Sequence, residues 1–322
     1  MSDLLTKCAV CGALLDEEDL FCAECGTEAP DHQQSVPLAH QLSTHNFQCQ
    51  GCGASMSYDA KAGALRCPFC GSENMQQQAD TSEIAPQGVV PFAISHEEVL
   101  SRLKNWLADG FWRPGDLAKA AAVVKMTPVY VPFWVFSAKT KTHWTADSSR
   151  TPAGARGDWY PLSGTTSGIH SGVLVGASSV LTPAEITAMG DFDLSTAIPP
   201  QDADLNRVTY ERFAMQRKYA RPFARAGLES REMQRIAPTI PGNNRNLKVN
   251  TRITDLTSQP LLLPIWVMAY RYQDNVYRFV ANGQTGRSTG KAPNSMWKIG
   301  SALGAALIAL IVLLLVIMSS LR

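Results

Sequence analysis

Apolar residues recur at helical spacing in several segments of the chain. Ser95 and Glu98 form a capping box, and apolar residues on one face follow it at Val99, Leu103 and Leu107, so a helix is expected there. Thr182 to Glu185 predicts a second, short helix with proline at its first position. Three further segments have helical patterns: 115–125, 205–219 and 228–236.

Runs rich in β-branched and aromatic residues lie between these helices. They predict strands at 129–138, 172–178, 247–254 and 261–281, the last with a hairpin turn at 273–275. This mixture of elements predicts an α+β domain over residues 89–296.

Two of the predicted strands share a pattern. Val129 to Phe136 (VYVPFWVF) and Leu261 to Met268 (LLLPIWVM) both read apolar-x-apolar-Pro-apolar-Trp-Val-apolar. Because proline cannot donate to a strand ladder, each copy is expected at an edge, a bulge or a strand start. The pattern indicates a duplicated β unit, although chance similarity of two apolar strands stays open.

The segment from Ile299 to Met318 contains no charged residue. A helix of twenty residues is about 30 Å long, which matches the apolar core of a bilayer. The pattern therefore predicts a C-terminal transmembrane anchor over 297–322. Arg287, Lys291 and Lys298 precede the run and Arg322 alone follows it, so the bulk of the chain is expected on the cytoplasmic side of the inner membrane as a single-pass, tail-anchored protein.

The N-terminal region has a different composition. Two short cysteine-containing segments, 1–30 and 47–75, are separated by polar stretches at 31–46 and 76–88 that lack apolar periodicity and are expected to be flexible linkers. Neither cysteine segment is long enough to bury a core, so a bound metal is expected to stabilise each of them.

All eight cysteines fall into four Cys-x-x-Cys-Gly units. These begin at Cys8, Cys22, Cys49 and Cys67 and end their pairs at Cys11, Cys25, Cys52 and Cys70. Each unit directs two thiolates at one ion, and two units separated by the length of a hairpin complete a tetrahedron. The sequence therefore predicts two zinc ribbons with one Zn²⁺ each, and reduced thiolates agree with a reducing compartment.

Charge is distributed unevenly along the chain. Residues 1–90 contain 12 acidic and 3 basic residues (3 − 12 = −9), whereas residues 91–322 contain 16 acidic and 26 basic residues (26 − 16 = +10). The segment 205–252 is the most basic, with 11 basic and 3 acidic residues. It is a candidate surface for anionic lipid, nucleic acid or the chain's own acidic arm, and a solvated helix face is the alternative.

The chain resembles bacterial membrane-anchored proteins with twin N-terminal zinc ribbons, which are described as transcription-factor-IIB-type zinc-ribbon proteins and sometimes as primosomal or helicase-like. The Cys-x-x-Cys-Gly units, YVPFWVF at 130–136, LLPIWVMAYRY at 262–272 and the segment 277–299 carry the resemblance over nearly the full length. It implies this architecture and no particular biochemical activity.

No catalytic constellation is recognisable. Gly286 to Ala292 lacks both the spacing and the hydroxyl of a phosphate-binding loop, which argues against a helicase. The histidines show no metalloprotease spacing, and every cysteine is assigned to zinc. They are His32, His40, His45, His96, His143 and His170.

These observations predict a non-enzymatic adaptor that is tethered to the membrane and presents its ribbons to a cytoplasmic or membrane protein. The alternative is a membrane-associated nucleic-acid-binding or transcription-associated factor. The first ribbon has Lys7 alone against eight acids between Asp3 and Asp31, which disfavours contact with a polyanion, because binding to nucleic acid requires cationic surface. The second ribbon is balanced in charge. A third reading, in which the basic domain holds the acidic arm in an autoinhibited state, also stays open.

Overall fold

The computed structural model describes residues 6–8, 10–12, 14–15, 46–58, 66–78, 84–203, 205, 208–273 and 275–320. Within these residues, Thr6–Lys7 (β1) pairs with Leu14–Leu15 (β2) in a two-stranded sheet. All other described strands join one 10-stranded sheet, whose main path runs β12-β11-β10-β7-β9-β4-β3-β5. Two more strands, β6 and β8, pair with β10 and β7 respectively.

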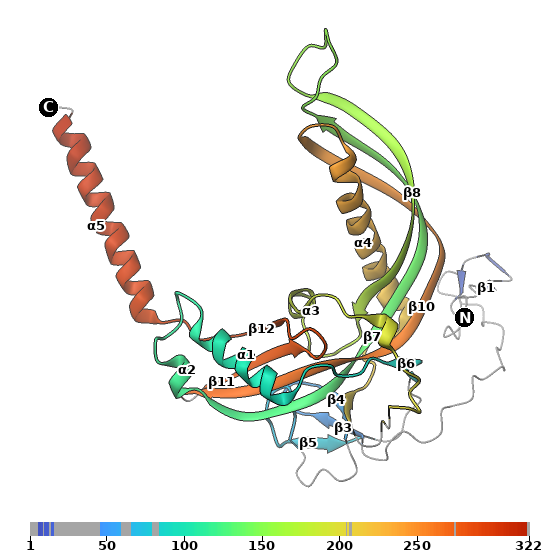
Figure 1. Cartoon of the computed structure of the whole chain (residues 1–322), viewed down its shortest axis with the longest axis vertical. Coiled ribbons are helices and arrows are strands. Elements are labelled where there is room, and N and C mark those ends of the chain that lie inside the picture. Colours follow the sequence, from blue (N-terminus) through green and yellow to red (C-terminus); the bar gives the residue numbers. More distant parts are fainter. Residues whose placement is uncertain are drawn as a thin grey trace.

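Two very long strands form the centre of the large sheet, β7 (Ala122–Ser148) and β10 (Asn244–Tyr272). They pair antiparallel along nearly their whole length, and they curve together so that one face of the sheet is concave (Figure 1). The other strands are β3 (Asn46–Cys49), β4 (Ser55–Ser57), β5 (Met75–Gln77), β6 (Gly88–Val89), β8 (Tyr160–Gly176), β9 (Thr209–Glu211), β11 (Asn275–Asn282) and β12 (Ser288–Gly290).

Helices cover parts of this sheet. They are α1 (His96–Ala108), α2 (Leu117–Ala120), α3 (Pro183–Met189), α4 (Arg217–Ile236) and α5 (Met296–Ser320), with 3₁₀ turns at Leu194–Thr196 and Ala237–Thr239. The capping boxes predicted at Ser95 and Thr182 are present at the starts of α1 and α3. Helix α4 lies on the concave side of the long strands (Figure 1). Its buried positions follow a spacing of four residues: Ala220, Ala224, Leu228, Glu232 and Ile236.

Several predicted boundaries differ from the structure. The segment 205–219 was expected to be helical, but it contains β9 before α4 begins at Arg217. The expected helix over 115–125 is reduced to α2, because β7 begins at Ala122. In both cases pairing with the central strands outweighs local helical propensity, which contributes less than about 1 kcal/mol per residue.

Helix α5 corrects the prediction about the C-terminus. Among the residues that the structure describes, no helix has both the length and the apolar character needed to cross a membrane.

This finding contradicts the fold class in one respect, the C-terminal transmembrane helix at 297–322. It equally contradicts the single-pass, tail-anchored localisation at the inner membrane.

The repeated Pro-x-Trp pattern occupies equivalent places in two similar units. Strand β7 pairs with β10 on one side. On its other side, the neighbour changes from parallel β9, whose pairing ends at Tyr130, to antiparallel β8, whose pairing begins at Phe133. On β10, it changes from parallel β6 at Leu262 to antiparallel β11 at Ile265. Pro132 and Pro264 therefore each lie where the neighbouring strand switches.

The backbone explains why proline fits at both switches. The carbonyl of Pro132 accepts from Ala177 N at 2.9 Å, and that of Pro264 accepts from Gly283 N at 2.8 Å. The N–H and C=O of a strand residue point to the same side, so the donor that proline lacks would face the interrupted ladder. Both prolines are internal to long strands, whereas the sequence predicts an edge, a bulge or a strand start for each.

The two tryptophans hold helices in a reciprocal way. Trp134 on β7 donates its indole N–H to the carbonyl of Met215 at 2.8 Å, and Trp266 on β10 donates to Ile94 at 3.3 Å. Each acceptor lies two residues before the first residue of a helix, α4 and α1 respectively. Each long strand thus fixes the helix that precedes the other long strand.

Replacing Trp134 by Phe removes the indole donor and leaves the Met215 carbonyl without it. We expect a loss of about 1–3 kcal/mol in the free energy of unfolding, measured by urea denaturation. Trp266→Phe should have a similar effect. Trp112→Phe is the control, since Trp112 is 44% exposed, and it should change the stability by less than about 0.5 kcal/mol.

Candidate metal centre

The four cysteines of the second ribbon lie on two knuckles with the same backbone geometry. In the first, Gly53 N donates to Cys49 O at 2.8 Å, and in the second, Gly71 N donates to Cys67 O at 2.9 Å. Gly53 and Gly71 have φ values of 78° and 75°, a conformation that residues with a side chain rarely adopt. This explains the glycine that follows each cysteine pair in the sequence.

The knuckles bring four sulfur atoms together. One Sγ each from Cys49, Cys52, Cys67 and Cys70 lie within 4.8 Å of one another, the one such cluster of metal-ligating groups in the part of the chain that the structure describes. Cys49 Sγ and Cys70 Sγ are 3.5 Å apart, and Cys52 Sγ and Cys67 Sγ are 3.6 Å apart. A tetrahedral ion with metal–sulfur distances of about 2.3 Å requires sulfur–sulfur distances of roughly 3.8 Å, so the cluster fits such an ion.

Hydrogen bonding and charge within the cluster also favour a cation. Gly51 N donates to Cys49 Sγ at 3.3 Å. Hydrogen bonding to Cys67 lowers the pKa of Cys52 to about 5, whereas the pKa of Cys67 is raised by sharing that hydrogen bond and by burial. Burial raises the pKa of Cys70 to about 11. Crowded thiols resist multiple ionisation, and a bound divalent cation reverses that tendency.

The second ribbon is built into the main sheet. Met56 and Ser57 on β4 pair with Glu211 and Tyr210 on β9, which in turn pairs with β7. Its buried side chains, including Met56, Tyr58 and Phe69, belong to the same apolar cluster as Val131 and Phe133 of β7. The ribbon was expected to be a separate module on flexible linkers, and its core is instead shared with the central strands.

The first ribbon is described only in part. Gly12 N donates to Cys8 O at 2.9 Å and Gly12 has a φ of 72°, so the Cys8 and Cys11 unit has the same knuckle geometry as those of the second ribbon. Cys22 and Cys25 lie outside the described residues. The structure therefore shows one cluster that can hold a metal, and the second site remains a prediction.

Glu211 is a buried acidic residue beside this centre, and no sequence motif marks it. Its Oε1 accepts from Ser179 N at 2.8 Å and from Ser179 Oγ at 2.9 Å, while its Oε2 is buried with no hydrogen-bond partner among the described residues. Burial raises the pKa of Glu211 to about 7, opposed by the serine hydrogen bonds and reinforced by charge on Cys52. The segment that contains Glu211 was expected to be helical, so its place on a strand beside the cysteines could not be inferred.

The remaining candidates from the sequence are dispersed. His32, His40 and His45 lie outside the described residues, and His96 stacks edge-on against Trp266. His170 contacts Glu232 of α4 and His143 contacts Thr165. Among the described residues, these histidines do not converge on a shared site.

No family model matches the chain. It is similar to the Uncharacterized protein YdjG of Bacillus subtilis (strain 168), with 26% identity over 318 residues that covers 80% of this chain and 92% of that protein. No solved structure matches.

The position of Glu211 predicts a pH dependence. Its pKa in the folded protein lies above the value of about 4.3 expected in the unfolded chain, so folding favours the protonated form. Its contribution is fully present below pH 4.3 and is lost as the pH rises through about 7. Glu211→Gln should therefore raise the unfolding free energy at pH 8 by an amount on the order of 1–3 kcal/mol and flatten its pH dependence.

Glu229→Gln is the matched control, since this glutamate lies on α4 in an exposed pair with Arg225. Urea denaturation between pH 5 and pH 8 measures both variants. A Glu211→Gln protein whose stability falls with rising pH as steeply as that of the unmodified chain contradicts the assignment.

Proposed function

We propose that the protein is a non-enzymatic zinc-ribbon adaptor that mediates protein–protein interaction. The observation that supports this most is the closed donor set of the second ribbon, because four thiolates complete a tetrahedron and leave no position for substrate. Such sites stabilise the fold around them, and this one lies where β4 joins the ribbon to the rest of the sheet.

Zinc is the metal that the donor set favours. Four thiolates in tetrahedral array suit Zn²⁺ or an iron–sulfur cluster, and paired knuckles with a hairpin between them are typical of zinc ribbons. With the second ribbon as the template, the same knuckle geometry at Cys8 supports a corresponding site completed by Cys22 and Cys25. This arrangement agrees with the proposed membership of the twin zinc-ribbon proteins.

The charge of the N-terminal region supports a protein partner. Residues 1–90 carry a net charge of −9, and each ion held by four thiolates adds two further negative charges. A polyanion is repelled by such a surface, whereas a basic protein surface is attracted. We therefore place the contact with a partner on the acidic first ribbon.

The basic segment 205–252 gives little support to the nucleic-acid alternative. Several of its arginines bind within the fold. Arg231 donates to the carbonyls of Ser171 and Gly172, Arg235 pairs with Glu232, and Arg225 pairs with Glu229. Cations that are occupied in this way contribute less to counterion release, which drives nucleic-acid binding.

Metal analysis of the intact protein, purified under reducing conditions, tests the centre. We expect two zinc ions per chain. Cys67→Ser should remove one of them and expose the β9 amides to hydrogen exchange, because β4 then loses its support. Cys8→Ser should remove the other and leave β9 protected. A zinc-free protein with an unchanged Tm contradicts the structural role of the metal.

The adaptor role is tested by capture of binding proteins with intact protein and with a Cys8→Ser/Cys11→Ser variant. We expect specific partners that are lost with the variant, while the exchange protection of the main sheet stays unchanged. Electrophoretic shift at about 150 mM salt should show no tight complex with DNA or RNA. Sub-micromolar nucleic-acid binding by the intact protein supports the alternative and contradicts the adaptor.

A further inference from the structure

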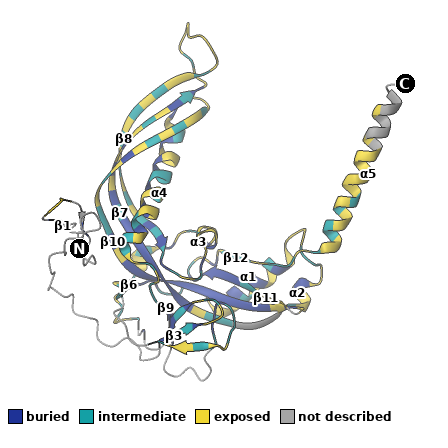
Figure 2. Cartoon of the chain, turned by 180° about the vertical axis from the view of Figure 1, so that it is seen from behind, coloured by how far each residue is buried: buried dark blue, intermediate teal, exposed yellow. Residues whose placement is uncertain are grey.

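Strands β7, β8 and β10 continue beyond the rest of the sheet as a three-stranded arm with two different faces. The inner face packs on α4, where Thr140 Oγ1 donates to Glu232 Oε1 at 3.1 Å and Thr142 Oγ1 lies 3.1 Å from Thr251 Oγ1. Because side chains alternate along a strand, Lys141 and its neighbours two residues away point to the other side. The alternation of exposed and less exposed residues along β8 is visible in Figure 2.

The inner face holds the buried carboxylate of Glu232, which pairs with Arg235 and contacts His170 and Thr140. Burial raises the pKa of Glu232, but hydrogen bonds from Arg235, His170, Thr142 and Thr140 together lower it to about 2. This buried carboxylate is therefore stabilised within the fold.

The outer face differs, because it carries cations without matching acids. Lys141 on β7 lies directly opposite Arg252 on β10. Like charges in this position destabilise a sheet. Its other neighbour across the strands is Ser167 on β8, which carries no charge. The two carboxylates nearest to this face along the strands are engaged, Asp147 with Arg245 and Asp255 with Lys139.

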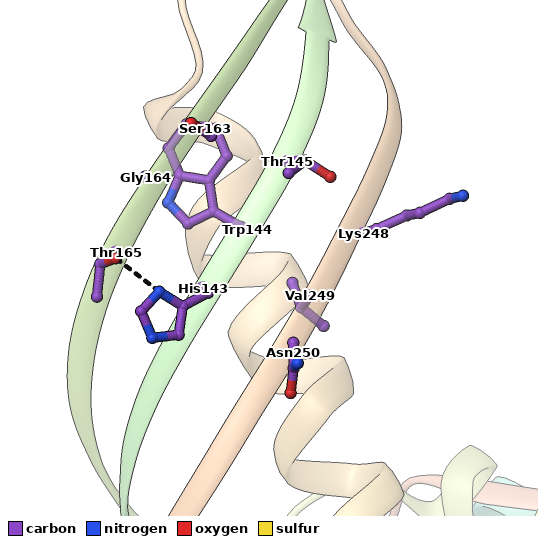
Figure 3. A pocket seen from close by; sticks show the side chains of 9 residues that line it. All are labelled: His143, Trp144, Thr145, Ser163, Gly164, Thr165, Lys248, Val249 and Asn250. Carbon is purple, nitrogen blue, oxygen red and sulfur yellow. Dashed lines mark hydrogen bonds between the residues drawn. The ribbon is translucent and has the colours of Figure 1, made fainter.

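A third cation extends the outer face. Lys248 lies on β10 four residues before Arg252 and lines a hollow of about 350 Å³ with His143, Thr145, Ser163, Thr165 and Asn250 among its other residues. In Figure 3 the Lys248 side chain extends away from β10, and His143 Nδ1 lies 2.9 Å from Thr165 Oγ1 on the adjacent strand. Within the described residues, no ion pair involves Lys141, Lys248 or Arg252. This set of three is called the outer cationic face below.

We propose that the outer cationic face binds the chain's own acidic run Asp16 to Asp19, with the sequence Asp-Glu-Glu-Asp. The run provides four adjacent carboxylates, which match three unpaired cations and the hydroxyl donors of Thr145 and Ser163 between them. Its binding neutralises the repulsion between Lys141 and Arg252. This intramolecular contact does not depend on the partner proposed for the ribbons, and it competes with that partner for the same acidic residues.

The length of the intervening chain allows the contact. The linker 31–46 contains 16 residues (46 − 31 + 1) and spans at most about 53 Å when extended. Asn46 of β3 is connected to Tyr130 of β7 through β4 and β9, three strand spacings or about 15 Å away. Lys141 lies 11 residues (141 − 130) further along β7, about 36 Å, so the first ribbon can reach the outer cationic face without unfolding.

The outer cationic face suits an acidic peptide better than a nucleic acid. Single-stranded nucleic acid is held by aromatic platforms on which bases stack. The rings that line the hollow beside Lys248 are those of His143 and Trp144, and Trp144 packs against the buried cluster of Ile236 and Ile240. Three cations would release few counterions from a nucleic acid, so they would contribute little to its binding affinity, whereas duplex binders use about six to ten phosphate contacts.

Carbodiimide crosslinking of the full-length protein tests the proposal, since the reagent joins carboxylates to lysine amines only in direct contact. We expect crosslinks from Asp16–Asp19 to Lys141 and Lys248 at 50 mM salt that decrease at least fivefold at 500 mM. Arg252→Glu should reduce the Lys248 crosslink about tenfold. When Arg252→Glu is combined with replacement of the acidic run by lysines, a new crosslink should form between the run and position 252.

The controls separate this contact from general changes. Lys104→Glu and Lys119→Glu alter exposed cations on α1 and α2 and should leave the crosslinks unchanged. Arg252→Gln should keep or raise the Tm, because it removes a repulsive pair, and it should still weaken the crosslink. Mixing isotopically labelled and unlabelled chains should show crosslinks within one chain.

Three results overturn the proposal. The first is the absence of crosslinks from the acidic run to either lysine, and the second is a crosslink that persists after Arg252→Glu. The third is nucleic-acid binding by the intact protein that Lys141→Glu/Arg252→Glu abolishes, which assigns this face to a polyanion of another class.

Discussion

The antiparallel pairing of β7 with β10 is the constraint on which the other parts of the structure depend. These two strands are the longest in the described chain, and β6, β8, β9 and β11 each pair directly with one or the other of them. Their pairing places Pro132 next to Leu262 and Tyr130 next to Pro264 in the sheet. Each proline interrupts the ladder on the far side of its strand, where a short parallel neighbour ends and a long antiparallel one begins.

The sequence predicted the local elements that have strong signals. The capping boxes at Ser95 and Thr182 and the apolar strands on either side of Trp134 and Trp266 are present in the structure. The cysteine pairs and their glycines predicted the sulfur cluster of the second ribbon, since a Cys-x-x-Cys-Gly turn has few other conformations. These features are determined by a few adjacent residues, so one sequence is enough to identify them.

Other features depend on contacts between distant residues. The full length of β7 and β10 was not predicted. The segment 247–254 was expected as a strand separate from 261–281, and 139–148 of β7 was not assigned, because the few apolar residues in these stretches leave the alternation of a strand weakly marked. The docking of the second ribbon arises from three-residue strands, β4 and β9, whose pairing has no local signature. The predicted C-terminal membrane anchor is contradicted by the finding for α5. That prediction rested on the uncharged composition of the segment alone.

The exchange of short strands between the two halves has a consequence for folding. Strand β6 belongs to the first half but pairs with β10, and β9 belongs to the second half but pairs with β7. The partners of β6 at Leu261 and Leu262 are more than 170 residues further along the chain, so they emerge late during synthesis. Strand β6 therefore stays unpaired until β10 is synthesised. The entropic cost of closing such a long loop must be met before packing between these strands can offset it. The chain is thus expected to fold slowly and as a whole, with its central apolar strands in need of protection until translation of β10 is complete.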